Sequence, residues 1–257
     1  MRRIAISLIM LFFALEASAW GQKGHDVTAY IAECHLTPKA ARRIAQVLDG
    51  HSLVYYSNWM DNASHTDEYR YTSTWHYANI DEGKTFETMP RNRKGDVVSA
   101  VEMLVDSLRQ GSMSHHEEKV CLMMLVHLVG DMHSPMHAGH LSDLGGNRVA
   151  VKFFKKQTNL HSVWDSDLVE AAHRWGYSEW QREIDRYTKT QREEIAHGEI
   201  KDWFMETASL CAEIYRSTPQ GSTISYDYIA RYTPLIEEQF CRGGYRLARL
   251  LNTIYGK

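Results

Sequence analysis

The sequence predicts an all-α protein with one short β-hairpin or strand. Apolar residues recur at helical spacing along most of the chain, and capping residues precede several of these stretches. The alternating pattern typical of strands occurs at one place. No change in composition, internal repeat or low-complexity segment divides the chain, so we expect a single mainly helical domain.

The start of the chain has the pattern of a signal peptide. Two arginines precede an apolar run, and an Ala-Ser-Ala tripeptide provides the small side chains of a cleavage site. We therefore expect residues 1–19 to be removed during export, to the periplasm or outside the cell, and residues 20–257 to form the domain. Cleavage would make Trp20 the new N-terminus. Its free amino group titrates near neutral pH and, together with its own carbonyl oxygen, can chelate a metal ion.

Helices are expected throughout the first half of the mature chain. One spans about residues 25–34, and a second spans residues 39–48, after Pro38, which suits the first turn of a helix. A third is expected over residues 97–108, because its apolar residues form one stripe and Asp96 can cap its first turn.

The most apolar helix is expected over residues 119–133. Ser114 and Glu117 form a capping-box sequence ahead of it, and Pro135 should end it. The alternating pattern lies at residues 149–154, after a Gly-Gly-Asn turn signal, and predicts one short strand or one arm of a hairpin.

Three further helical stretches are expected from residue 178 to about residue 255. Pro234 and the pair Gly243-Gly244 are possible points where these helices kink or break. No later apolar run approaches the roughly 20 residues that a membrane span requires, so we expect no stable membrane anchor.

The charge of the chain argues against general binding to nucleic acid. The formal charge is −3, and it becomes −4 when the first nineteen residues, with two arginines and one glutamate, are removed. A protein this acidic repels a polyanion unless bound divalent cations reverse the sign of the charge locally.

Two histidine–aspartate pairs indicate a metal site. On a helix, residues four apart project from the same face, so His127 and Asp131 can converge on one ion or bridge two. His161 and Asp165 repeat this spacing. The proline that follows the first pair breaks the helix, which lets His137 turn toward a second ion.

Further candidate ligands lie earlier in the chain. Asp61 and His76 each follow a tryptophan closely, and His25 lies five residues after Trp20. Imidazole and carboxylate groups without thiolate suit Zn²⁺, and several ions in one site suit hydrolysis better than maintenance of the fold.

Each of these residues also has a structural explanation when it is taken alone. A single histidine on an apolar helix is commonly a core residue, and an aspartate can cap a helix or carry a solvated charge. His133 is left out of the candidate site because it lies six residues from His127, on a different face of the helix. The combination of ordered spacing, export and the tryptophan terminus favours the metal site.

The spacing of these motifs resembles that of the zinc-dependent single-strand nucleases of the S1/P1 type, a family distantly related to bacterial zinc phospholipase C. The resemblance covers roughly residues 20–170. The motifs that carry it are Trp20, His25, Trp59-Met60-Asp61, Trp75-His76-Tyr77, His127-x-x-Gly-Asp131-x-x-x-Pro-x-His137, Asp143-Leu-Gly-Gly-Asn147 and Asn159-Leu-His161-x-x-Trp-Asp165.

The resemblance implies a phospholipase C/nuclease-like helical fold and three Zn²⁺ per chain. The first ion would be held by Asp61, His76, His127 and Asp131. The second would be held by the amine and carbonyl of Trp20, by His25 and by the shared Asp131. The third would be held by His137, His161 and Asp165. Asp61 and Asp131 would also be catalytic, with hydroxide between the two ions that Asp131 bridges as the nucleophile.

The resemblance also suggests how a substrate is held. A base would stack on Tyr77 with Asn79 as its polar partner, and stacking favours single strands because the base must be unpaired. A core role for the Tyr77 ring is an equal alternative. Asp143 and Asn147 would form a turn or support the ligands. Ser64 stands where the family often has a basic residue, so either catalysis is slower or another side chain fills that role.

These inferences predict an exported phosphodiesterase whose partner is a single-stranded nucleic acid or nucleotide. It would cut DNA and RNA to 5′-phosphate products and perform 3′-nucleotidase chemistry. One alternative is a zinc phospholipase C, which needs an apolar rim for lipid. Another is a zinc-binding protein without turnover, although three or four protein ligands per ion leave positions open for water, as catalytic zinc requires.

Overall fold

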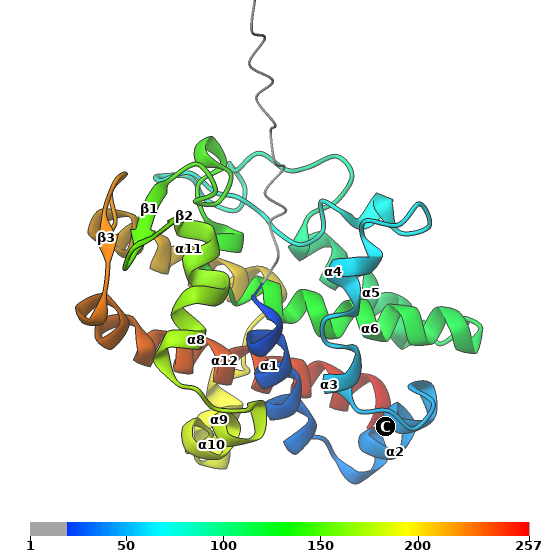
Figure 1. Cartoon of the computed structure of the whole chain (residues 1–257). Coiled ribbons are helices and arrows are strands. Elements are labelled where there is room, and N and C mark those ends of the chain that lie inside the picture. The colour runs from blue at the N-terminus through cyan, green and yellow to red at the C-terminus, as the bar shows by residue number, and fades with distance from the viewer. Residues whose placement is uncertain (1–19, 257) are drawn as a thin grey trace, which may run out of the picture.

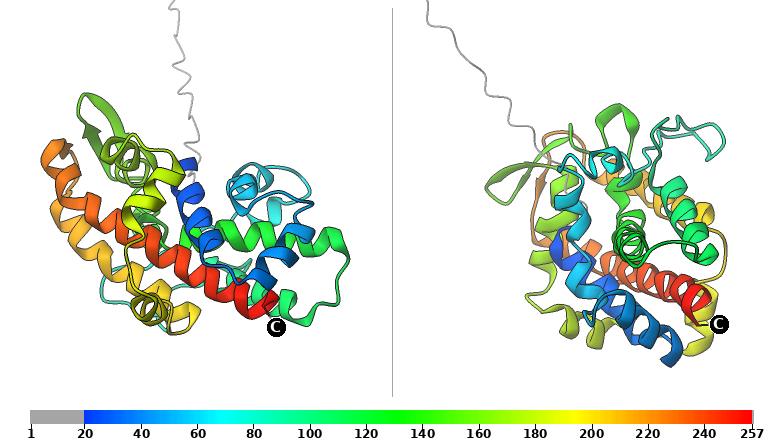
Figure 2. Two further views of the ribbon diagram at one scale, coloured as in Figure 1. Left: turned by 90° about the horizontal axis from the view of Figure 1, so that it is seen from below. Right: turned by 90° about the vertical axis from the view of Figure 1, so that its right-hand side faces the viewer.

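Helix α6 (His115–Met132) runs through the middle of the structure, a computed structural model that describes residues 20–256 (Figure 1). Every residue from position 122 to position 132 of this helix is buried. A helix that is apolar on all sides must be covered on all sides. Helices α1 (Gln22–Cys34), α5 (Val97–Gln110) and α12 (Tyr226–Tyr255) pack against it (Figure 2).

Shorter elements complete the domain. Before α5 these are α2 (Pro38–Val47), α3 (Leu53–Tyr56), α4 (Trp59–Ala63) and the 3₁₀ turn η1 (Arg70–Thr72). After α6 they are η2 (Pro135–Ala138), η3 (Leu141–Asp143), α7 (Leu160–Ser162), the π-helical turn η4 (Val163–Asp167), α8 (Leu168–Ala172), α9 (Tyr177–Ile184), α10 (Lys189–Ile195) and α11 (Ile200–Ser217). The prediction of a mainly helical fold is confirmed. The signal peptide predicted for residues 1–19 lies outside the described residues.

The predicted capping residues do cap α5 and α6, although α6 begins at His115, four residues before its predicted start. Asp96 and Ser114 each accept a hydrogen bond from the third residue of the following helix, and in both cases that residue caps in return. The side chain of Thr37 accepts a hydrogen bond from the Ala40 amide and so caps α2 from one side only. Helix α6 ends at Met132, just before Pro135 begins η2. Local hydrogen bonding thus sets these ends.

The C-terminal part departs from the prediction in two ways. It holds four helices rather than three, because the Thr188 side chain caps a new helix, α10, soon after α9 ends. Helix α12 continues through Pro234 and Gly243-Gly244, so the suggested breaks are wrong. A Cβ at Gly244 would lie 2.4 Å from Ile31 Cγ2, so glycine here permits the close crossing of α12 and α1.

A small sheet lies beside the helices. Strands β1 (Ala150–Phe153) and β2 (Lys156–Asn159) form an antiparallel hairpin, as predicted, and β3 (Thr223–Ile224) pairs with β1 in parallel. The two residues of β3 are too few to show an alternating pattern. Strand β2 leads directly into α7, which places His161 next to the core.

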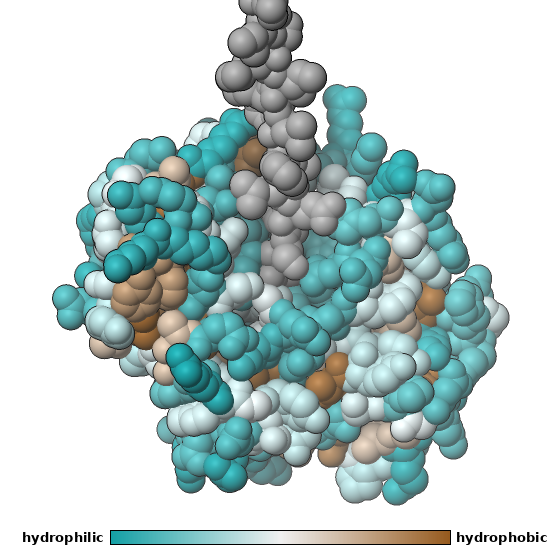
Figure 3. Space-filling model, viewed as in Figure 1, coloured by the Kyte–Doolittle hydropathy of each residue, from teal (hydrophilic) through white to brown (hydrophobic). Residues whose placement is uncertain are grey.

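The described residues include no helix that could span a membrane. Within residues 20–256 no helix has both the length and the apolar character needed to cross a bilayer. On the face drawn in Figure 3, hydrophilic residues predominate, and apolar residues form separate small areas.

The carboxylate of Asp185, the residue after α9, connects α9 to α12 and to the end of α1. It lies 2.8 Å from His35 Nε2, accepts a hydrogen bond from the Tyr245 hydroxyl at 2.6 Å and accepts another from Gln181 Nε2 at 2.9 Å. Burial raises the pKa of Asp185, but these hydrogen bonds outweigh burial and lower the pKa to about 2.

This shift predicts a contribution to acid stability. The pKa is lower in the folded state than in the unfolded chain, so the contribution is fully present above about pH 4 and is lost as the pH falls toward 2. Asp185→Asn should therefore lower the free energy of unfolding by about 2 kcal/mol at pH 6 and should change it little at pH 2. Urea unfolding of both proteins without metal, across this range, checks the prediction; an equal loss at both pH values would contradict it.

Candidate metal centre

Helix α6 supplies the two side chains at the middle of the site. His127 and Asp131 are both fully buried, and His127 Nε2 lies 3.3 Å from Asp131 Oδ2. The four-residue spacing therefore produces the shared face that the sequence predicts. The described part of the chain contains three groups of histidine and aspartate, two of which include His127. In each group the ligand atoms lie within 4.8 Å of one another.

The first group consists of Asp61, His76 and His127. Asp61 comes from α4, and its Oδ1 lies 3.3 Å from His127 Nε2. His76 lies in a turn after η1, and its Nδ1 lies 3.2 Å from His127 Nε2 and 2.9 Å from Asp131 Oδ2. Asp131 thus also reaches this group, as the resemblance implies.

The second group consists of His25, His127 and Asp131. His25 comes from α1, its Nε2 lies 3.3 Å from Asp131 Oδ1, and its ring stacks on that of His127 with centroids 3.9 Å apart. Trp20 precedes α1 and is fully buried, with its ring 5.0 Å from that of Phe240. The next amide, that of Gly21, donates a 2.6 Å hydrogen bond to the carbonyl of Asp165, a residue of the third group.

The third group consists of His137, His161 and Asp165. His161 Nε2 lies 2.9 Å from Asp165 Oδ2, and His137 Nε2 lies 3.8 Å from Asp165 Oδ1. The predicted helix around His161 is a short α-turn followed by the π-helical turn η4. Such wide turns often occur at functional sites.

Backbone carbonyls orient three of the histidines. Each accepts a hydrogen bond from an imidazole Nδ1, so that nitrogen carries the proton and the Nε2 lone pair is left to bind a metal ion. The bonds run from His127 to Ser57, from His137 to His76 and from His161 to Gly145, at 2.7, 2.6 and 2.7 Å.

Several buried atoms at the site lack hydrogen-bond partners among the described residues. They include Nε2 of His25, His137 and His161 and Oδ1 of Asp131. Buried polar atoms are rarely left unpaired, because desolvation without a partner is costly. Divalent cations would satisfy these atoms, and the donor set of nitrogen and oxygen fits zinc.

The pKa shifts of three ligands suit metal binding. Burial lowers the pKa of His25 and of His137, so both imidazoles are neutral at neutral pH. Burial raises the pKa of Asp131, but the neighbouring histidines, His127 first, outweigh burial and hold this pKa well below its usual range. Neutral imidazole and ionised carboxylate are the forms that bind metal ions. At His127 and His161 burial lowers the pKa, but nearby carboxylates outweigh burial and raise it, so a metal ion competes with a proton there.

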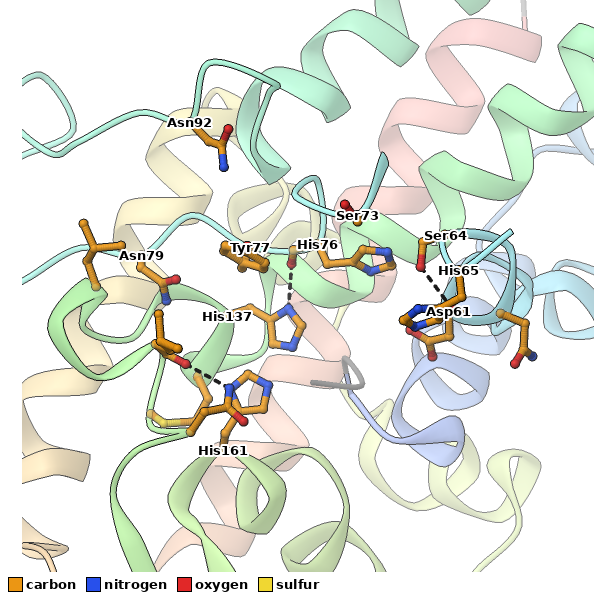
Figure 4. A pocket seen from close by; sticks show the side chains of 15 residues that line it. Asp61, Ser64, His65, Ser73, His76, Tyr77, Asn79, Asn92, His137 and His161 are labelled. Atoms are coloured by element: carbon orange, nitrogen blue, oxygen red, sulfur yellow. Dashed lines mark hydrogen bonds between the residues drawn. The ribbon is translucent and has the colours of Figure 1, made fainter. Parts of the chain in front are cut away.

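A cavity of about 630 Å³ is lined by Asp61 and His76 of the first group and by His137 and His161 of the third. Figure 4 shows Asp61 on one side of it, His161 on the other and His76 and His137 between them. The remaining lining residues are Asn62, Ser64, His65, Ser73, Tyr77, Asn79, Asn92, Met136, Leu141, Leu144 and Asn147.

The two residues predicted to bind a base both line this cavity. Tyr77 is half-buried and also borders a neighbouring cavity of about 200 Å³. Asn79 is buried, and its Nδ2 donates a 3.1 Å hydrogen bond to the carbonyl of Gly139. The sequence analysis did not predict that Leu141 and Leu144 line this cavity. An isolated leucine has no local sequence pattern that shows whether it is exposed.

His133 lies apart from the three groups, as expected. Its Nδ1 donates to the carbonyl of Val129 at 2.7 Å, and its Nε2 lies 3.0 Å from a guanidinium nitrogen of the buried Arg246 on α12. Burial lowers the pKa of His133 to about 3, so the ring is neutral. It joins α6 to α12.

The loop that orients His161 is held by a tyrosine outside the motifs. Leu144, Gly145 and Gly146 all have positive φ, at 59°, 64° and 83°. The carboxylate of Asp143 accepts hydrogen bonds from the Gly146 amide at 2.6 Å and from the hydroxyl of Tyr215, on α11, at 2.9 Å. Asp143 therefore has the turn-forming role suggested by the sequence, with Tyr215 as its long-range partner.

Removal of this hydroxyl should weaken metal binding at the third group. Tyr215→Phe leaves Asp143 without its partner on α11, so the Gly145 carbonyl that orients His161 is held less firmly. Loss of such support typically costs 10- to 100-fold in metal affinity, and we expect about 10-fold. The metal affinity is measured by competition with a chelator. Tyr226→Phe, on a side chain that is 77% exposed, is the control; equal affinities in both variants would contradict the prediction.

A helical fold that gathers three histidine–aspartate groups beside an open cavity is typical of a metal-dependent hydrolase. The family model described as S1/P1 Nuclease matches residues 20–256, and the chain belongs to this family. It is therefore a hydrolase that acts on phosphodiester bonds, and its substrate is nucleic acid.

Curated relatives match over nearly their whole length. Endonuclease 4 of Arabidopsis thaliana is 27% identical, with 93% of this chain and 90% of the relative covered. Nuclease S1 of Aspergillus oryzae is 25% identical, with 98% of each chain covered. Nuclease P1 of Penicillium citrinum is 27% identical, with 92% of this chain and 98% of the relative covered.

Proposed function

We propose that this chain is an exported nuclease that hydrolyses single-stranded DNA and RNA to 5′-phosphate products and also acts as a 3′-nucleotidase. The observation that carries the proposal is the clustering of three histidine–aspartate groups, with unpaired buried ligand atoms, beside a cavity that residues of the first and third groups line. The family supports phosphodiester hydrolysis, and the relatives are named as nucleases and endonucleases.

Three zinc ions fit the donor set. The first would be held by Asp61, His76, His127 and Asp131; the second by Trp20, His25 and Asp131; the third by His137, His161 and Asp165. When bound, zinc activates water and stabilises negative charge on phosphate oxygens. Three divalent ions also outweigh three carboxylates, so an acidic protein acquires a cationic cavity floor.

Side chains of this protein would position the metal ions and select an unpaired base. Asp131 joins the first two groups, and the carbonyl-bound imidazoles keep their free nitrogens aimed at the site. The half-buried ring of Tyr77 offers a stacking surface on the cavity wall, with Asn79 beside it. A base must be unpaired to stack there, which favours single strands.

A direct assay tests this proposal. Protein that begins at Trp20 is loaded with zinc and incubated with a single-stranded oligonucleotide, with its duplex and with phosphatidylcholine. We expect three zinc ions per chain, cleavage of the single strand at least about 100-fold faster than the duplex, and 5′-phosphate ends. Equal rates on both nucleic acids would contradict single-strand selectivity.

Phosphatidylcholine is included in the assay because two exposed leucines line the cavity. Leu141 and Leu144 are 38% and 47% exposed at the cavity, and an apolar rim is what a phospholipase C requires. Faster turnover of phosphatidylcholine than of single-stranded DNA would favour that activity. Zinc binding without turnover of any substrate would favour the zinc-binding protein instead.

A further inference from the structure

The cavity has one side chain outside the proposed ligand set that can carry positive charge. Among the fifteen described residues that line it, none is lysine or arginine. The histidines are His76, His137 and His161, which belong to the three groups, and His65, which does not.

The ring nitrogens of two ligand histidines are already directed to other groups. His137 and His161 each use Nδ1 to bind a backbone carbonyl and face their group with Nε2. His76 places Nδ1 within 2.9 Å of Asp131. Its Nε2 is buried without a hydrogen-bond partner among the described residues. The imidazole that lines the cavity outside the three groups is that of His65.

Ser64, which stands where a basic residue was expected, cannot provide a positive charge. It is buried, and its hydroxyl donates a 3.1 Å hydrogen bond to the carbonyl of Asp61. The next residue, His65, is exposed and lines the cavity. Its amide donates to the carbonyl of Asn62 at 3.2 Å, which continues the turn of α4 that carries Asp61. Figure 4 shows His65 beside Asp61 at the edge of the cavity.

We propose that His65 contacts the scissile phosphate of the substrate; this inference rests on the proposed nuclease function. Its imidazole donates a hydrogen bond to a non-bridging phosphate oxygen. Negative charge on these oxygens must be stabilised as the phosphodiester bond breaks, and a donor in a preformed cavity does so without reorganisation. The position next to Asp61 places this donor on the side of the first group.

Matched variants test the contact. His65→Ala should lower kcat on a single-stranded oligonucleotide by about 10- to 100-fold. It should also weaken the binding of inorganic phosphate to the zinc-loaded protein by about 10-fold, measured by isothermal titration calorimetry, with unchanged zinc content. His65→Arg should restore most of both values, because arginine also donates to phosphate. His116→Ala, at an exposed histidine in the first turn of α6, is the control and should change neither.

The outcomes separate this inference from the proposed function. Unchanged kcat and phosphate affinity in His65→Ala would overturn the contact, and so would loss of zinc, which would make His65 a support for Asp61. If the wild-type protein does not cleave single strands while His65→Ala still weakens phosphate binding, the nuclease proposal fails and the phosphate contact stands.

Discussion

Asp131→Asn is expected to remove two of the three proposed zinc ions and to lower single-strand cleavage by about 10³-fold or more. The carboxylate is fully buried and faces two groups at once, with Oδ1 3.3 Å from His25 Nε2 and Oδ2 2.9 Å from His76 Nδ1. Asparagine keeps the shape but removes the charge that offsets two cations. Several kcal/mol of charge stabilisation would be lost with the ions.

Elemental analysis and steady-state kinetics measure this effect together. The variant should retain about one zinc ion per chain, at the third group, whose proposed ligands do not include Asp131. Asp67→Asn is the control, because that side chain is 95% exposed and lies outside the cavity lining. Circular dichroism shows whether the variant is folded. A folded variant with three zinc ions would falsify the bridging role.

The addition of a single residue before Trp20 is expected to remove the zinc ion of the second group. An amide nitrogen has no available lone pair, whereas the free α-amino group can chelate with its own carbonyl. The structure buries Trp20 completely, and the Gly21 amide is bonded to the carbonyl of Asp165, so residues 20 and 21 are held beside the third group. We expect cleavage to fall by about 100-fold or more, because that ion would share Asp131 with the first group.

Two proteins that differ only at the start test this effect. One begins at Trp20 and the other carries one extra glycine, and mass spectrometry establishes both termini. The extended protein should bind two zinc ions rather than three. A matched glycine added after Lys257 should change nothing. Full zinc content and full activity in the N-terminally extended protein would rule out the chelate.

Local patterns in the sequence were sufficient for most of the helices and for the centre of the site. Asp96, Ser114 and Pro135 act on residues three or four positions away, so their effect on helix ends can be predicted without the fold. The spacing of His127 and Asp131 is likewise a property of one helix. These features depend on short-range hydrogen bonds and helical geometry alone.

Tertiary structure decided the features that depend on distant partners. Gly244 remains inside a continuous helix because it meets Ile31, more than 200 positions away, at a crossing too close for a side chain. The hydroxyl of Tyr215 reaches Asp143 from another helix, and His65 borders the cavity only because α4 packs against α6. The sequence alone determined which side chains can form helices and bind metal. The packing of helices against one another determined which of those side chains meet, because contacts between distant residues leave no periodic pattern along the chain.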